Sequence, residues 1–303
     1  MNHNVRTDWT RRDFLARIAA SISMIAKSHE AGAAPAEKIR IGINTSSFGH
    51  QRNSTDPAER IRLDDIPAVL RNKLDMRIID LESVTLGPRD LQTAARFRVR
   101  AEAAGCEIIN LKVNAHDLPF DSENVALREH ALAEYRAWIE VAAALGARSL
   151  RPYPATSRPR LETLIESYTR LADHGDRHGI LLLIENYKWI ETDPNVMPEI
   201  IGRLGGRIRA LVDTGNWADA GTRRTGLAAA FPHAFTCDFK VRELSAGGEH
   251  VAYDLRECFT IGRRAGYTGP WCLEHTHRRR RELLRELRLI KLRLETWDGA
   301  WER

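Results

Sequence analysis

Short apolar runs alternate with longer amphipathic segments along most of the chain, and this alternation constrains the fold more than any other feature. Eight runs have the length and continuous hydrophobic character of buried parallel strands: Ile39–Asn44, Met76–Leu81, Cys106–Val113, Arg148–Leu150, Ile180–Ile184, Ile208–Val212, Ala234–Phe239 and Pro270–Leu273. Segments between them repeat apolar residues at helical spacing: Leu91–Ala104, Ala126–Leu145, Leu161–His178, Leu255–Ala265 and Glu282–Leu294. Eight strand–helix units over about 265 residues predict a single (β/α)8 TIM barrel, an α/β fold.

A doubly wound α/β sheet would show the same alternation, so the loop after the first strand separates the two folds. A dinucleotide-binding sheet carries G-x-G-x-x-G at this point. Residues 44–49 instead read Asn-Thr-Ser-Ser-Phe-Gly. No Gly/Ser-rich linker and no break in composition follow residue 38. We therefore predict one barrel domain over residues 38–303.

The first 37 residues do not share this alternation. Residues 10–15, Thr-Arg-Arg-Asp-Phe-Leu, resemble a twin-arginine export signal, and small residues at 31–36 suit a signal peptidase. The apolar stretch between them, residues 18–26, is too short for a stable membrane span. We predict a twin-arginine signal peptide over residues 1–37 and a periplasmic or other extracytoplasmic location. An amphipathic helix or a disordered arm is the alternative.

Four of the predicted strands each end in one carboxylate: Glu185, Asp213, Asp238 and Glu274. A single acid of this kind could be a helix N-cap or a loop residue. In a TIM barrel, however, residues at the C-terminal ends of strands form the active site, so the four should converge. Carboxylates at close range cannot all stay ionised without a cation. An all-oxygen site favours Mn²⁺ or Mg²⁺ over Zn²⁺, so the sequence predicts a divalent metal cofactor.

The net charge and the cysteine content limit the classes of partner and metal site further. The net charge is +5, and much of the excess lies in Arg278–Arg281 and in the N-terminal arginines. A solvated basic helix explains such a run, so we predict no nucleic-acid partner. None of the four cysteines forms a C-x-x-C pair, and a thiolate zinc site is therefore not indicated.

Four segments carry a resemblance to a known family: residues 184–186 (Ile-Glu-Asn), 212–216 (Val-Asp-Thr-Gly-Asn), 238–240 (Asp-Phe-Lys) and 266–274 (Gly-Tyr-Thr-Gly-Pro-Trp-Cys-Leu-Glu). Over about residues 38–295 the chain resembles the xylose isomerase-like TIM barrels, a family of sugar phosphate isomerases and epimerases. The resemblance implies one divalent metal with four ligands: Glu185, Asp213, Asp238 and Glu274. The departure is Asp238, because the family usually has histidine two residues before the lysine of that strand.

The resemblance also implies a reaction. The metal would chelate adjacent oxygens of a sugar or polyol and stabilise an enediolate. Glu185 and Glu274 would flank the substrate as general acid and base. Lys240 would neutralise developing oxyanion charge, or it would pair with Asp238. We thus expect an isomerase or epimerase. The alternatives are a lyase or dehydratase acting on a keto-sugar or inosose, and a non-catalytic sugar-binding barrel.

The remaining candidate residues would contact the carbohydrate substrate. Arg151 follows the fourth predicted strand and His116 follows the third. Asn216 and Trp217 follow the sixth, where the indole could stack on a sugar face. A plain packing role is the alternative for these side chains. A homo-oligomer is compatible with the fold, because exposed barrel helices in such proteins often pair. The sequence does not specify the sugar, or whether it is phosphorylated.

Overall fold

The computed structural model describes residues 39–153 and 157–301. The predicted signal peptide at residues 1–37 lies outside the described residues and stays a prediction. Within the described ranges, no helix combines the length and the apolar character needed to cross a membrane.

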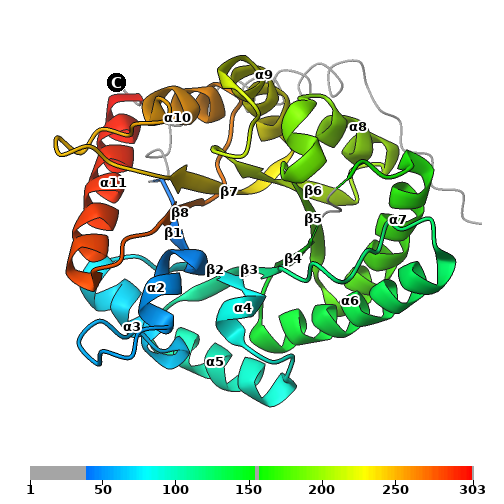
Figure 1. Cartoon of the computed structure of the whole chain (residues 1–303), viewed down its shortest axis with the longest axis horizontal. Coiled ribbons are helices and arrows are strands. Elements are labelled where there is room, and N and C mark those ends of the chain that lie inside the picture. The colour runs from blue at the N-terminus through cyan, green and yellow to red at the C-terminus, as the bar shows by residue number, and fades with distance from the viewer. Residues whose placement is uncertain (1–38, 154–156, 302–303) are drawn as a thin grey trace, which may run out of the picture. The chain divides into compact units, whose positions relative to one another are not determined.

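Eight parallel strands close into a barrel in chain order, and β8 pairs with β1 to complete the ring (Figure 1). The strands are β1 (Ile41–Asn44), β2 (Ile78–Glu82), β3 (Glu107–Val113), β4 (Ser149–Pro152), β5 (Leu181–Glu185), β6 (Ile208–Asp213), β7 (Ala234–Val241) and β8 (Trp271–His275). All eight overlap the predicted runs. The predicted (β/α)8 TIM barrel is confirmed.

Helices surround the barrel on its outer side (Figure 1). The α-helices are α2 (Gly49–Arg52), α3 (Ile66–Val69), α4 (Ser83–Leu86), α5 (Leu91–Ala103), α6 (Val125–Leu145), α7 (Leu161–His178), α8 (Val196–Arg203), α9 (Ala220–Ala230), α10 (Leu255–Arg264) and α11 (Arg280–Trp301). Short 3₁₀ or π segments are η1 (Thr45–Phe48), η2 (Leu63–Asp65), η3 (Leu70–Leu74), η4 (Lys188–Thr192) and η5 (Phe231–His233).

Local sequence explains where the long helices begin and end. The side chain of Asp90 accepts hydrogen bonds from the first amides of α5, and Asp254 does the same for α10. Gly146 and Gly179 end α6 and α7 with φ of 69° and 68°, a left-handed conformation that favours glycine. One face of each long helix packs on the sheet, as Leu164, Tyr168 and Leu171 of α7 do. This layer between helices and barrel is the hydrophobic core.

Two register shifts in the barrel decide which side chains point inward. Between β2 and β3 the pairing passes from Ile79–Ile108 to Asp80–Asn110, so one extra residue lies in β3. Between β6 and β7 a similar shift brings Asp238 opposite Asp213. Because side chains alternate between the two faces of a strand, a shift by one residue moves every following side chain to the opposite face of the sheet. The polar residues after each shift consequently face the interior.

Candidate functional site

The C-terminal ends of the strands surround a small polar cavity of about 150 Å³. Eleven residues line it: Glu82, Lys112, Asn114, His116, Arg151, Tyr153, Glu185, Tyr187, Asn216, Lys240 and Glu274. Most are charged or carry hydrogen-bonding groups. The cavity is smaller than the roughly 300–1,000 Å³ usual for ligand pockets, so a small hydrophilic molecule suits it best.

The predicted acids converge at this end of the barrel. One carboxylate oxygen from each of Glu185, Asp213 and Asp238 lies within 4.8 Å of the others, close enough for all three to hold one metal ion. Glu274 of β8, the fourth predicted ligand, is not part of this group of three, and Lys240 links it to the site with Nζ 2.7 Å from Asp213 and 3.3 Å from Glu274. One expectation was wrong in detail. Asp238 does not end its strand, because β7 continues beyond the predicted Phe239 to Val241, which places Asp238 deep in the barrel at 0% exposure.

Lys112 of β3 reaches across the barrel to the acids on the opposite wall. Its ammonium group contacts a carboxylate oxygen of Asp238 and lies 4.0 Å from Oε1 of Glu185. The side chain is 2% exposed. Burial lowers the pKa of Lys112, but the negative charges of Asp238 and Glu185 outweigh it and raise the pKa well above its ordinary value. Lys112 therefore stays positively charged between two predicted metal ligands.

Lys240 supplies a second buried cation. Its Nζ lies 2.7 Å from Oδ2 of Asp213 and 3.3 Å from Oε1 of Glu274, and it donates to Oδ1 of Asn216 at 3.0 Å. Lys240 does not pair with Asp238, as one predicted alternative held. The two side chains are two residues apart on β7, and the longer lysine extends towards the strands on either side.

Arg151 of β4 is the third cation, and it holds Glu185. Its Nε lies 2.8 Å from Oε2 of Glu185, and its Nη2 donates to Oδ1 of Asn114 at 2.7 Å. The Arg151 side chain is almost fully buried. The guanidinium group thus positions a carboxylate of the site, in addition to lining the cavity that a substrate would enter.

The Asp213-Thr214-Gly215-Asn216 turn after β6 orients Asp213. Backbone amides of Gly215 and Asn216 donate to Oδ1 of Asp213 at 2.7 and 3.1 Å, which leaves Oδ2 for Lys240. Gly215 is required by packing, since a Cβ there would lie 2.7 Å from both Cδ of Lys240 and the hydroxyl of Tyr253. The glycine of this motif therefore makes room for the lysine.

The two predicted acid–base residues have opposite electrostatic environments. Burial raises the pKa of Glu274 to about 7, although Lys240 partly opposes the shift. For Glu185 burial also acts upward, but Lys112 and Arg151 together lower the pKa below its ordinary value. Glu274 therefore exchanges protons near neutral pH, whereas Glu185 stays ionised.

The other predicted substrate contacts separate into two groups. Asn216 lies at the cavity and donates to Oε1 of Glu185 at 3.4 Å. His116 lines the exposed rim, with its ring centroid 4.2 Å from that of Tyr153. Trp217 is not among the lining residues. It is 5% exposed and packs on Gly226 of α9, where a Cβ would come within 2.2 Å of the indole.

Several site residues were missed by the sequence predictions. Lys112 was hidden inside the apolar run Cys106–Val113, and its signal is that a lone charge interrupts a buried strand. Glu82 directly follows the run that ends at Leu81, the same pattern that singled out the other acids. Asn44 donates to Oε2 of Glu274 at 3.2 Å and Asn114 donates to Oε2 of Glu82 at 3.0 Å, but an asparagine after a strand carries no distinctive signal.

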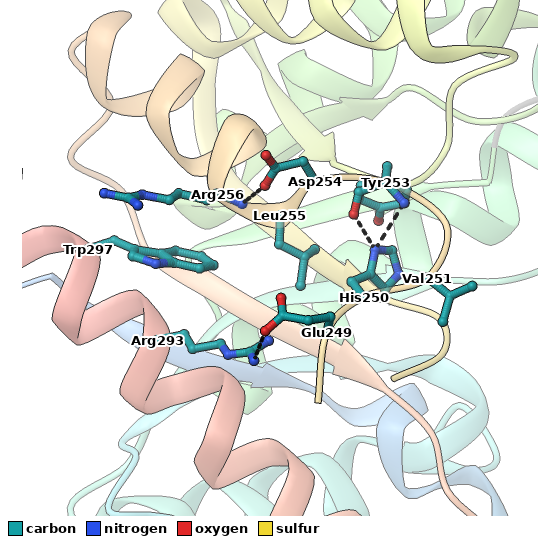
Figure 2. Close-up of a pocket in the computed structure, with 9 residues that line it drawn as sticks. All are labelled: Glu249, His250, Val251, Tyr253, Asp254, Leu255, Arg256, Arg293 and Trp297. Carbon is teal, nitrogen blue, oxygen red and sulfur yellow. Dashed lines mark hydrogen bonds and ion pairs between the residues drawn. The ribbon is translucent and has the colours of Figure 1, made fainter. Parts of the chain in front are cut away.

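A second pocket lies between the segment that follows β7 and helix α11 (Figure 2). It has a volume of about 630 Å³ and is lined by Glu249, His250, Val251, Tyr253, Asp254, Leu255, Arg256, Arg293 and Trp297. Glu249 and Arg293 form an ion pair of 2.8 Å at its edge. None of the predicted site residues lines this pocket, so it is not the predicted site.

Comparison with known proteins agrees with the architecture. The family model described as xylose isomerase-like TIM barrel matches residues 75–293. No curated protein matches the chain.

Solved structures share the fold at low sequence identity. An L-ribulose 3-epimerase has a TM-score of 0.65 at 18% identity, covering 87% of this chain and 97% of that chain. A probable 3-DHS dehydratase from Bacillus anthracis has a TM-score of 0.63 at 13% identity, covering 84% and 99%. A xylose isomerase-like TIM barrel protein from Mycobacterium smegmatis, solved in complex with magnesium, has a TM-score of 0.58 at 19% identity, covering 86% and 97%.

Proposed function

Because the chain belongs to the xylose isomerase-like TIM barrel family, we propose that it is a sugar or polyol isomerase or epimerase. The observation that carries this proposal is the cavity at the barrel mouth, where Glu185 and Glu274 face the same small space as Lys112 and Lys240. Proton transfer beside a carbonyl needs a base, an acid and positive charge near the carbonyl oxygen. The cavity holds all three.

The two glutamates divide the acid–base work according to their environments. Glu274 has a pKa of about 7 because of burial, and its side chain is 21% exposed, so it can both take and return a proton at the substrate carbon. Glu185 is 4% exposed and held by Arg151. In its ionised form, Glu185 accepts a hydrogen bond from a substrate hydroxyl group, or it removes the proton from the opposite face of the substrate carbon.

The ammonium groups of Lys112 and Lys240 supply donors for the substrate oxygens. Enediolate formation places negative charge on the former carbonyl oxygen, and fixed cations in a buried site stabilise such charge strongly. Lys240 is 15% exposed and Lys112 is 2% exposed, and both line the cavity. His116 and Asn216 would contact the remaining hydroxyl groups.

The oxygen donors of the four acids suit the predicted Mn²⁺ or Mg²⁺ ion, but the lysine and arginine side chains that already contact these acids do not. An all-oxygen set favours these ions, and one structural neighbour is solved with magnesium. However, a lysine or arginine already contacts each of the four acids: Glu185, Asp213, Asp238 and Glu274. We therefore assign no step of the reaction to a metal.

A dehydratase would begin with the same proton abstraction and then expel a hydroxyl group. One structural neighbour is a probable 3-DHS dehydratase and another is an L-ribulose 3-epimerase, so structures of this fold are described with either activity. The products separate them, because a dehydratase releases an unsaturated product or its keto tautomer whereas an epimerase conserves mass.

Solvent-deuterium exchange tests the proposal. The full chain is incubated in D₂O with a panel of ketoses, aldoses and inososes, and deuterium beside the carbonyl is measured by NMR. We expect incorporation for at least one substrate and a loss of about 10²–10⁴-fold for Glu274→Gln, the range of general acid–base catalysis. Glu162→Gln on α7 is the control. Binding without exchange would support the non-catalytic barrel, and unchanged exchange in Glu274→Gln would contradict the assigned role.

We also propose export through the twin-arginine pathway, on the strength of Arg11 and Arg12. Replacement of both by lysine should retain a tagged chain inside the cytoplasm, as measured by fractionation. Equal export of the variant would contradict the proposal. A homo-oligomer stays a prediction, and light scattering of the purified protein measures it.

A further inference from the structure

We propose that the ammonium group of Lys112 takes the place of the divalent cation among Glu185, Asp213 and Asp238, so that this barrel works with an internal cation and binds no metal there. This cation lies in the site of the proposed function. The absence of metal binding does not depend on that function, whereas the role of Lys112 in the reaction rests on it. Its evidence is the arrangement of charges within the barrel.

The first observation is that each of the four acids already has a positively charged side chain of the protein as a partner. Lys112 contacts Asp238, Lys240 contacts Asp213 and Glu274, and Arg151 contacts Glu185. Three cations contact these four carboxylates, and the buried acids Asp80 and Glu82 of β2 lie on the same side of the barrel as Lys112. A buried cluster of this kind needs counter-charges in order to stay ionised, and here Arg151 and Lys240 supply them from adjacent strands and Lys112 supplies one from across the barrel.

The second observation is that Lys112 and a metal would compete for the same space. An ion bound to oxygens of Asp238 and Glu185 would lie roughly 2.0–2.6 Å from each. The Nζ of Lys112 contacts Oδ2 of Asp238 and lies 4.0 Å from Oε1 of Glu185. Two cations cannot share this gap, because like charges repel each other strongly in a buried site. Metal binding would require the lysine to leave.

The third observation is that the register of β3 and the residue at position 238 fit each other. The carboxylate of Asp238 is the direct partner of Lys112. The extra residue in β3 near Ile109 turns Asn110 and Lys112 inward opposite Asp80 and Glu82. A histidine at 238 would leave the buried lysine without its closest counter-ion.

The consequence for the reaction is that the electrophile is an ammonium group. A lysine Nζ offers up to three N–H donors as a compact charge. Such a group stabilises a developing oxyanion by hydrogen bonding and needs no exchangeable cofactor. Activity should therefore survive complete removal of divalent ions.

The test measures Mn²⁺ binding rather than turnover. A surface trio, Glu140, His174 and His178, could also hold an ion, so all proteins carry His178→Ala. The full chain is dialysed against Mn²⁺, and bound metal and Tm are measured. We expect less than about 0.1 equivalent of metal and a Tm change below about 1 °C. One equivalent of bound Mn²⁺ that is lost in Asp213→Asn would overturn the proposal.

A gain-of-function variant sharpens the test. Lys112→Met combined with Asp238→His removes the internal cation and supplies a neutral ligand. With Mn²⁺ at a hundredfold excess over its Kd, Tm should rise by about 5–10 °C, the shift expected for a ligand that binds only the folded state. Lys73→Met, at an exposed position, should behave as the parent. If the double variant folds but binds no Mn²⁺, the proposal fails. If the double variant does not fold, Mn²⁺ binding to the parent protein tests the proposal by itself.

Failure of this inference and failure of the proposed function give different results. Exchange that persists in excess EDTA supports both. Exchange that requires Mn²⁺ overturns the role of Lys112 and leaves the isomerase proposal intact. No exchange in a protein that also binds no metal contradicts the function and leaves the internal cation standing.

Discussion

The two halves of the barrel contribute different chemistry to the same cavity. Strands β5 to β8 bring the four convergent acids, together with Lys240. Strands β1 to β4 bring the cations Lys112 and Arg151 and the amides of Asn44 and Asn114, together with the buried acids Asp80 and Glu82. The second half thus carries the predicted metal ligands, and the first half adds two of the three cations that contact them.

Acids on one wall of a barrel do not by themselves define a metal site, because side chains of the opposite wall can supply the positive charge. The acids on β5 to β8 would call for a divalent cation if they stood alone. Lys112 changes this requirement from the opposite wall. The first half of the chain therefore controls whether the second half is a metal site.

The largest expected effect comes from removing the cation of the first half. Lys112→Met leaves Asp238, which is fully buried, without its closest cation, so we expect a loss of about 3–5 kcal/mol in the free energy of unfolding. Urea denaturation measures the loss. Lys73→Met on the surface should stay within about 0.5 kcal/mol of the parent. Equal stability of Lys112→Met and Lys73→Met would show that the buried pair is not formed.

Removing the cation of the second half should cost less. Lys240 is 15% exposed, so water can partly solvate Asp213 and Glu274 in Lys240→Met. We expect a loss of about 1–3 kcal/mol, the desolvation penalty of a partly satisfied group. The ratio to Lys112→Met, measured in the same denaturation series, is the informative quantity. A greater loss for Lys240→Met would reverse the assigned order of the two halves.

The close packing of Gly215 against the Lys240 side chain provides a test with a smaller expected effect, and this test is purely steric. In Gly215→Ala the new methyl group would lie 2.7 Å from Cδ of Lys240, so we expect overpacking to cost about 1–3 kcal/mol. Gly202→Ala in α8 is the matched control, because nothing lies within 4 Å of its Cβ position. That change should be neutral or stabilise by up to about 1 kcal/mol. Similar Tm values for both variants would contradict the packing argument.

The smallest effect is expected at an exposed ion pair outside both halves of the site. Arg158 lies 3.4 Å from Asp193, and its side chain is 58% exposed. Arg158→Met should change stability by only about 0–1 kcal/mol, because solvent screens such pairs. A loss as large as that of Lys112→Met would mean that burial does not decide the ranking.

The sequence predicted the second half of the site far better than the first. Continuous apolar runs identified the eight strands, and a carboxylate at or near the end of a run identified Glu185, Asp213 and Glu274. These patterns involve neighbouring residues of a single strand, so they can be recognised in the sequence alone. The inward direction of Lys112 depends on the register shift between β2 and β3, a property of two strands together. Trp217 shows the same limit, because only the packing of α9 reveals that it contacts Gly226.

Anomalous diffraction from crystals of the full chain grown with Mn²⁺ tests the central claim most directly. Data at the manganese absorption edge locate any bound ion independently of activity. We predict no anomalous peak among Glu185, Asp213 and Asp238, with the ammonium group of Lys112 against Asp238. A strong peak coordinated by these three carboxylates, with Lys112 displaced, would contradict the internal-cation account.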